Sequence, residues 1–437
     1  MKNTQETWKI DPFSSRFHLA SELSGAVGAT WMTLNSPGGR NPTFVPGLSR
    51  YRRWSQNEFS WFVKDDWKIT PSFTLNVGIR YEWFDAPFET EGLGVDWKGG
   101  GNRLFGLSGN GFGDLFRPGQ LNGALSEFLP IGPKTDNPGR KLWANDNNNF
   151  GPAIGFSWSL PWWGKDKTVV RAGYQLSYGR NAIFLVNSQI FGASGYAQSR
   201  YVNTATPTYL SDIRPIPQVA PPLGTIPITD RSVPAYGFDP NLYTPYYQNW
   251  NFSIDRALGK DWLLSARYVR NKGNGLPRSI NINETNIFEN GILDAYNVTL
   301  AGGNAPLFDA IFRGFTLAGR VVDGVNLTGS EFVRQSTATR GFLANNSPAG
   351  LANFLNINPS QCGFNGCLLS RAGLPPNFIT ANPQFTSAFY VSNFGNSSYD
   401  ALQIECAVKA GAARIYTFNV SDFARLAPDL SDRIAAP

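Results

Sequence analysis

Apolar and polar residues alternate with a period of two along several segments of the chain. The clearest segment is 72–83 (SFTLNVGIRYEW), in which every second residue from Phe73 to Trp83 is apolar and the residues between them are polar or small. A period of two predicts a β-strand with one apolar face rather than a helix. Its twelve residues exceed the about five or six of an average strand. They reach the about 9–11 that a tilted strand needs to cross a bilayer.

Pairs of such segments predict hairpins. Segment 58–67 precedes 72–83, and the residues between them, Lys68 to Pro71, end in a proline that suits a tight turn. The same arrangement recurs further along the chain. The predicted pairs are 150–158 with 168–178, 248–255 with 262–270, and 399–408 with 414–421; a single strand is predicted at 385–392.

The connections between these segments are strongly unequal in length. Turns inside the hairpins are short, whereas 85–149, 179–247 and 271–398 are long and rich in Gly, Pro and Asn. Loops longer than about 15 residues are uncommon in compact domains. Short turns that alternate with long exterior loops are typical of outer-membrane barrels. The pattern therefore predicts an all-β fold, an antiparallel transmembrane β-barrel segment of roughly 8–12 strands with long extracellular loops.

Tryptophans gather near the ends of the predicted strands. Indole rings favour a membrane interface, where one side is apolar and the other is wet. The predicted interface residues are Trp61, Trp67, Trp83, Trp158, Trp162, Trp163, Trp250 and Trp262. The alternative is a secreted or surface β-rich binding or adhesion module that acts through its long loops. In that fold the apolar face of 73–83 packs against a second sheet.

Composition narrows the fold class. Charged residues make up 16% of the 437 residues, against roughly 25% in an ordinary soluble domain. Aromatic residues reach 14%, with 45 Gly and 30 Pro, which argues against a helical bundle or a charge-rich disordered chain. The net charge of +6 is not concentrated in any Lys/Arg run, so no nucleic-acid partner is expected.

No constellation of residues predicts catalysis. His18 is the single histidine, which weakens any triad or histidine-based metal site. The glycine-rich stretch 99–113 lacks the spacing of a phosphate-binding loop. The Asn-rich stretch 145–149 has one carboxylate and no EF-hand spacing. We therefore expect no enzyme, no cofactor and no metal site.

Two other sets of residues carry expectations about sites. The polar faces of the predicted strands point into the lumen of a barrel, where their side chains contact a ligand or are paired and solvated. These candidate lumen residues are Arg80, Glu82, Arg171, Gln175 and Arg267. Cys362 and Cys367, in the longest loop, are candidates for a small disulfide ring in an exported protein. Cys406 falls on the apolar face of its strand.

Four stretches resemble the β-barrel of TonB-dependent outer-membrane receptors, specifically the Oar-like group. The resembling stretches are 59–83, 148–158 with 167–180, 245–273, and 395–405, in the order of the family. The resemblance implies a barrel of about 22 strands that contains a plug domain. Such a receptor lies in the outer membrane, contacts its lipid, and moves a bulky ligand inward with energy from the TonB complex.

The chain departs from that family plan at both ends. Residues 1–10 have no signal-peptide pattern, no plug domain precedes the strands, and the tail 422–437 lacks the usual final aromatic strand. We therefore expect 1–437 to be a partial barrel domain, with its clearest strands within 58–421. A chain without a plug is expected to show no TonB-dependent uptake when expressed alone.

Overall fold

The protein is described by a computed structural model. The described residues are 9–12, 26–35, 53–92, 94–162, 164–181, 186, 197–209, 226–229, 231, 234–258, 262–408, 415–416 and 434–435. His18 and Trp163 lie outside them.

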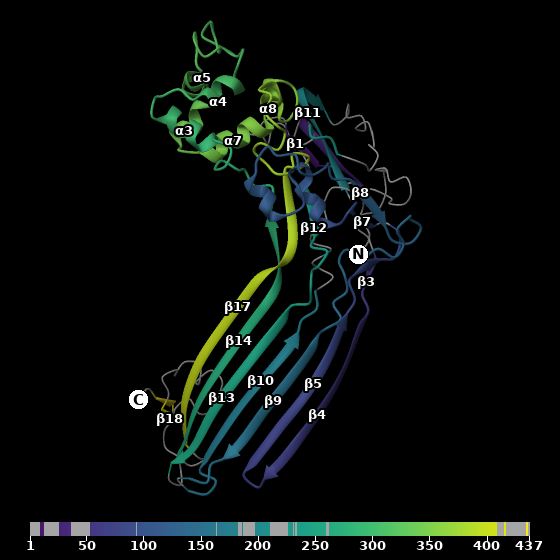
Figure 1. The fold of residues 1–437 in the computed structure, drawn as a ribbon, viewed down its shortest axis with the longest axis vertical. Coiled ribbons are helices and arrows are strands. Elements are labelled where there is room, and N and C mark those ends of the chain that lie inside the picture. The colour runs from purple at the N-terminus through teal and green to yellow at the C-terminus, as the bar shows by residue number, and fades with distance from the viewer. Residues whose placement is uncertain are drawn as a thin grey trace.

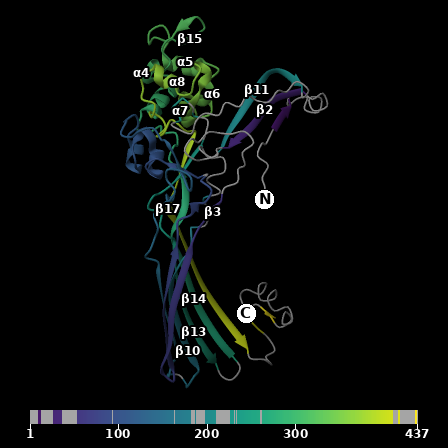
Figure 2. The same cartoon turned by 90° about the vertical axis from the view of Figure 1, so that its right-hand side faces the viewer.

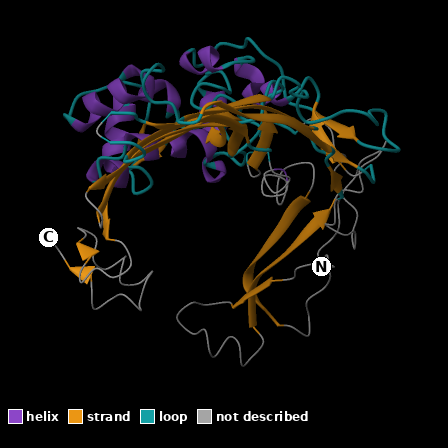
Figure 3. Ribbon diagram, turned by 90° about the horizontal axis from the view of Figure 1, so that it is seen from below, coloured by secondary structure: helices purple, strands orange, loops and turns teal. Residues whose placement is uncertain are grey.

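Eight of the described strands form one large sheet that runs along the lower part of the molecule (Figure 1). All neighbouring pairs are antiparallel except the first, in which β12 runs parallel to β17. Seen from below, the sheet curves as an open arc (Figure 3). In spatial order the strands are β12 (Pro234–Phe238), β17 (Ser387–Val408), β14 (Trp262–Asn281), β13 (Tyr246–Leu258), β10 (Thr168–Tyr178), β9 (Phe150–Ser159), β5 (Phe73–Phe84) and β4 (Glu58–Thr70).

Three of the predicted hairpins are present. β4 pairs with β5, β9 with β10 and β13 with β14, each antiparallel and joined by a short connection. The fourth prediction is wrong. β17 pairs along its length with β14, and Ile415–Tyr416 (β18) pairs with Ile434–Ala435 (β19) instead of with β17. The rest of 414–421 lies outside the described residues.

β14 and β17 are much longer than the alternation predicted. β17 spans 22 residues, so the separate strand expected at 385–392 is its first part. The register between the two strands shifts near Leu276, next to Pro277, which cannot donate a ladder hydrogen bond. In the lower halves of both strands, apolar and polar residues alternate. Above the shift the pattern is lost because β17 there is buried.

Above the sheet lies a buried cluster that we call the strand-end core. It joins β12, the first part of β17 and the segment 86–143 around Trp97, Phe105 and Phe385. The indole of Trp97 stacks on Phe128 at 4.8 Å and donates a hydrogen bond to the carbonyl of Tyr236 at 2.7 Å. Short elements surround this core: β3 (Trp54–Ser55), β6 (Phe88–Glu89), β7 (Gly94–Trp97), β8 (Phe128–Ile131) and the 3-10 helices η2 (Gly101–Ser108) and η3 (Phe112–Phe116).

Residues 287–379 fold into a second body, the helical cap, at the top of the molecule (Figure 2). Its core contains Tyr296, Phe308 and Leu351, each fully buried. The elements of the cap are α3 (Ile292–Leu300), α4 (Pro306–Ile311), β15 (Thr316–Leu317), β16 (Arg320–Val321), α5 (Gly329–Gln335), α6 (Arg340–Ala344), α7 (Pro348–Ile357), η5 (Pro359–Gln361) and α8 (Cys367–Arg371).

These two cores correct the expectation that 85–149 and 271–398 are plain loops rich in turns. Both segments contain packed helices, short strands and a buried core. Within the described residues, no helix is long and apolar enough to cross a membrane. The remaining described strands are β1 (Lys9–Pro12), β2 (Ala26–Asn35) and β11 (Ala197–Tyr209), which form a separate small sheet.

Side-chain contacts fix the cap internally and to the chain below it. The guanidinium of Arg231, which is buried, donates to the backbone carbonyl of Asn356 at 2.7 Å and to that of Pro376 at 3.3 Å. Burial lowers the pKa of Arg231 to about 10. A disulfide joins Cys362 and Cys367 at the start of α8.

Candidate functional site

The large sheet has one apolar face. The register places Val77, Ile154, Tyr174 and Trp250 side by side on this face across β5, β9, β10 and β13. Leu75, Phe156, Ala172 and Phe252 form the next row toward the short turns. Aromatic rings touch along the face, for example Tyr81 and Phe150 at 4.7 Å and Phe73 and Phe156 at 5.9 Å. The apolar residues of the alternating segments therefore lie on this one face of the sheet.

The apolar face is exposed. Ile154 is 51% exposed, Phe252 46% and Leu402 69%. Among the described residues no second sheet covers it, as the three-stranded sheet and the short ladders pair separately from it. The soluble alternative, in which residues 73–83 pack against a second sheet, is therefore wrong for the described part: Val77 and Ile79 remain 37% and 40% exposed. Apolar area of this extent needs a covering partner.

The predicted interface tryptophans fall into three groups. Trp67, Trp158, Trp162 and Trp262 lie at the end of the sheet that carries the short turns, and Trp158 contacts Trp162 at 5.5 Å. Trp83 lies at the opposite end, where its indole donates to the Asn147 side chain at 2.8 Å.

Trp61 lies near the first residue of β4, at the end away from the short turns, and Trp250 lies inside β13. Trp250 instead lies beneath the guanidinium of Arg270, at 5.8 Å. An interfacial role for the seven described tryptophans stays a prediction.

The opposite face of the sheet is polar and carries all five candidate lumen residues. Arg171 pairs across with Ser253, which pairs with Arg267, and Gln175 pairs with Ala153. Arg80 forms an ion pair with Glu82 at 2.9 Å, and Arg171 forms one with Asp255. The sequence thus places these residues on one face, as the register requires. That this face lines a lumen stays a prediction.

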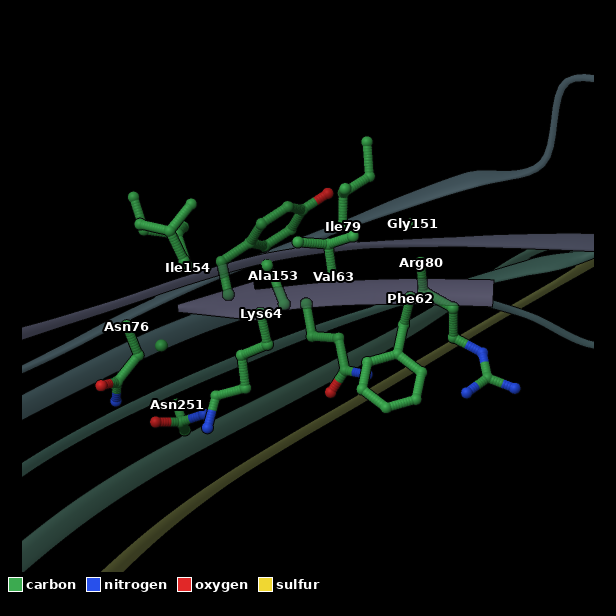
Figure 4. A pocket seen from close by; sticks show the side chains of 16 residues that line it. Phe62, Val63, Lys64, Asn76, Ile79, Arg80, Gly151, Ala153, Ile154 and Asn251 are labelled. Carbon is green, nitrogen blue, oxygen red and sulfur yellow. The ribbon is translucent and has the colours of Figure 1, made fainter. Parts of the chain in front are cut away.

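A hollow of about 390 Å³ opens between these polar side chains (Figure 4). Its floor is made of small residues, and its rim carries two cations and three amides. The floor consists of Gly78, Ala153, Gly155 and Gly173, and the rim of Phe62, Lys64, Asn76, Arg80, Gln175 and Asn251.

The small floor residues are what create the hollow. A Cβ added at Gly173 would lie 2.9 Å from the amide nitrogen of Asn251, so a larger residue there would displace that side chain. Figure 4 shows Phe62, Lys64 and Arg80 on the side of the ribbon opposite to Val63 and Ile79. Amides and paired cations on a shallow polar surface can hold a polar ligand reversibly, and they supply no activated nucleophile.

A buried amide network, which the sequence analysis missed, lies above the sheet. The side chain of Asn382 donates to the Leu104 carbonyl at 3.0 Å and to the Ser126 hydroxyl at 2.9 Å. Asn283 donates to the carbonyls of Asn382 and Phe385 at 2.9 and 2.8 Å. These bonds tie the strand-end core to the residues just before β17.

Asp96 is a buried acid of β7 beside the strand-end core, and Asp85 and Glu89 are buried as well. Asp96 accepts a hydrogen bond from Nε of Arg140 at 2.7 Å. Burial raises the pKa of the Asp96 carboxyl, and the Arg140 contact opposes that rise. The Asp96 carboxylate is paired with Arg140 and does not line the polar hollow. Within the described ranges no group of three or more His, Cys, Asp or Glu side chains is placed to hold a metal ion.

The family comparison agrees with the geometry of the sheet. Residues 43–421 match the family described as "Outer membrane beta barrel domain". The match spans all of the long strands from β4 to β17 as well as the cap. No curated protein matches the chain.

Proposed function

The chain belongs to the outer membrane β-barrel domain family, and from that premise we propose that it is the barrel of a TonB-dependent receptor for a bulky solute. Membership places the protein in the outer membrane, with its antiparallel strands crossing the bilayer and its long connections outside. The exposed apolar face of the sheet is then the lipid-facing wall. What we propose beyond family membership is the function of the barrel, the uptake of a bulky solute.

The single observation that carries the proposal is the folded mass on the outer ends of the strands. Outer-membrane barrels carry long extracellular loops, and in this chain the strand-end core and the helical cap hold two packed cores above the wall. A rigid outer scaffold is the arrangement expected where loops must recognise a ligand before it enters. The resemblance of 59–83 and 245–273 to Oar-like receptors supports the same function.

The proposed activity is conformational and breaks no covalent bond. A solute is captured between the outer loops and passes to the polar face, where the hollow beside Arg80 and Gln175 offers amides and cations. Its movement inward is coupled to a plug domain and to the TonB complex, which are the proposed partners. We propose no enzymatic step.

The test is accumulation of labelled solutes in cells of the source organism with and without the gene. The probes are a ferric hydroxamate, cobalamin, a maltooligosaccharide and an oligopeptide. We expect one of them to accumulate in a way that depends on the gene and stops when the inner membrane is de-energised. Accumulation that needs the gene but survives an uncoupler would contradict energised uptake and indicate a passive pore.

A further inference from the structure

A cleft of about 270 Å³ lies where the strand-end core meets the helical cap, and it shares no residue with the polar hollow of the sheet. Its walls come from η3, from the segment 281–289 at the end of β14, and from the segment 377–381 that leads to β17. In Figure 2 the blue turns of η2 and η3 lie directly below the cap. Pockets for whole small molecules begin at about 300 Å³, so this cleft fits one side chain or one small group.

Amide side chains hold the walls of the cleft together. The Asn286 side chain donates a hydrogen bond to the carbonyl of Leu115 at 3.3 Å, and the Asn286 backbone N–H donates to the carbonyl of Ile379 at 2.9 Å. The Asn377 side chain donates to the carbonyl of Gln120 at 2.7 Å. These bonds join segments that are far apart in the chain, so the cleft is formed before any ligand binds.

One polar atom of the cleft lacks a partner. Asn377 lines the cleft and is 1% exposed. Its amide nitrogen donates to Ser108 and Gln120, which fixes the orientation of the amide, and no described residue donates a hydrogen bond to its Oδ1. A buried acceptor without a donor costs free energy. The group that the cleft lacks is therefore a hydrogen-bond donor.

The cleft is acidic although the chain as a whole has a net charge of +6. Asp114, Glu284 and Glu289 line it, and none of the described lining residues carries a positive charge. Asp114 is fixed in place because its carboxylate accepts hydrogen bonds from the backbone N–H groups of Asn110 and Gly111 at 2.9 and 3.2 Å. Glu284 and Glu289 are exposed. Three carboxylates select a cation and repel an anion.

Two exposed aromatic rings also line the cleft. Phe116 is 67% exposed and Phe288 is 72% exposed. A guanidinium is planar, stacks on aromatic faces, and carries five N–H donors, whereas an ammonium is a compact point charge. Carboxylates, exposed rings and an acceptor without a donor therefore suit a guanidinium better than an ammonium.

We propose that this cleft binds a guanidinium group presented by an extracellular solute, either an arginine side chain of a peptide or a small guanidino compound. The group donates to Oδ1 of Asn377, its charge faces Glu284 and Glu289, and its plane lies against the ring of Phe116 or Phe288. The long connections of an outer-membrane barrel are extracellular, so the cleft meets solutes from outside. That the bound solute is also imported rests on the proposed uptake function.

The experiment is isothermal titration calorimetry of the detergent-purified full chain with acetyl-Phe-Arg-amide. Wild-type protein is compared with a Glu284→Gln/Glu289→Gln double variant and with Glu127→Gln, at an acid that pairs with Lys98 and does not line the cleft. The double variant should bind the peptide about tenfold more weakly, which corresponds to about 1.4 kcal/mol. Glu127→Gln should bind as wild type does.

A second arm uses wild-type protein alone, so it does not depend on the folding of a variant. A citrulline peptide has the shape of the arginine peptide without its charge and should bind at least tenfold more weakly. A dimethylated arginine peptide keeps the charge but loses two N–H donors, and it should also bind more weakly. Agmatine tests the source of the group: affinity equal to that of the peptide indicates a small guanidino compound, and much lower affinity indicates a peptide.

Equal binding of the arginine and citrulline peptides by wild type would overturn the proposal. So would equal binding of the arginine peptide by the folded double variant and wild type. The titration needs neither cells nor the TonB complex. A failure of energised uptake therefore leaves this site standing, and a failure of binding here leaves the uptake proposal standing.

Discussion

The two halves of β17 have opposite surroundings within one strand. In the lower half, Tyr399, Leu402 and Ile404 are 60–69% exposed, and in the upper half Ala388, Tyr390 and Val391 are at most 3% exposed. The upper half has a core of its own, because the strand-end core and the segments around it cover both sides. The lower half has only the other strands beside it. The upper region is therefore packed around its own core, whereas the lower region leaves large apolar side chains exposed among the described residues.

The largest effect confined to the upper region is expected from a cavity in the core of the helical cap. Phe308→Ala removes a fully buried ring and should lower the free energy of unfolding of the cap by about 3–5 kcal/mol. Hydrogen exchange of residues 287–379 measures that loss. The matched control is Val325→Ala, at a side chain 87% exposed. Loss of the protein from the membrane by Phe308→Ala would contradict the separation of the two regions.

A charge on the apolar face should disturb only the lower region. Ile154→Arg places a guanidinium on the lipid-facing wall and should cost about 2–4 kcal/mol of insertion free energy. Urea titration of the protein in lipid vesicles measures this cost. Gln175→Arg, on the polar face of the neighbouring strand, is the control and should insert nearly as well as wild type. Equal costs for the two variants would remove the distinction between the faces.

A smaller effect is expected from the capping box of Thr328 and Glu331 at the N-terminus of α5. The Thr328 hydroxyl accepts a hydrogen bond from the Glu331 backbone N–H at 3.1 Å, and the Glu331 carboxylate accepts one from the Thr328 N–H at 2.8 Å. Thr328→Ala removes one of the two and should cost about 1 kcal/mol. Hydrogen exchange in α5 should report the loss, while Thr328→Ser should retain most of the protection.

The smallest expected effect is a dependence of the cap on pH. The backbone N–H of Thr328 holds the pKa of Glu331 below its ordinary value of 4.5. A lowered carboxyl pKa contributes stability that is complete above the ordinary pKa and is lost as the pH falls below it. Protection of α5, corrected for intrinsic exchange, should therefore fall below pH 4.5 in wild type. Glu331→Gln should lack this component; an unchanged pH profile in that variant would contradict the assignment to Glu331.

The sequence predicted the lower region well because lipid on one side and polar surroundings on the other impose strict alternation. The segment 168–178 was predicted with the bounds of β10, and Arg171 was assigned to the polar face that the register gives it. The upper half of β14 was missed, and the upper half of β17 was predicted only as a separate strand at 385–392, because burial there weakens the alternation. Pro277 interrupts the pattern as well.

The cap was missed for a different reason. Its helices span only five to ten residues, too few for a clear period of 3.6. Its start signals were nevertheless readable: the Thr328–Glu331 capping box and the prolines Pro306 and Pro348 at helix N-termini. The polar hollow and the amide network join residues far apart in the chain. Such contacts depend on register and packing, which alternation alone does not give.

The central claim is that the apolar face of the sheet meets lipid while the cap meets water. Spin labels at Ile154→Cys, Leu402→Cys and Val325→Cys, in a Cys406→Ala background, test it in the membrane-inserted protein. We expect the labels at 154 and 402 to relax with dissolved oxygen and the label at 325 to relax with a water-soluble nickel complex. Stronger relaxation by the nickel complex at 154 and 402 would place that face in water and contradict the account.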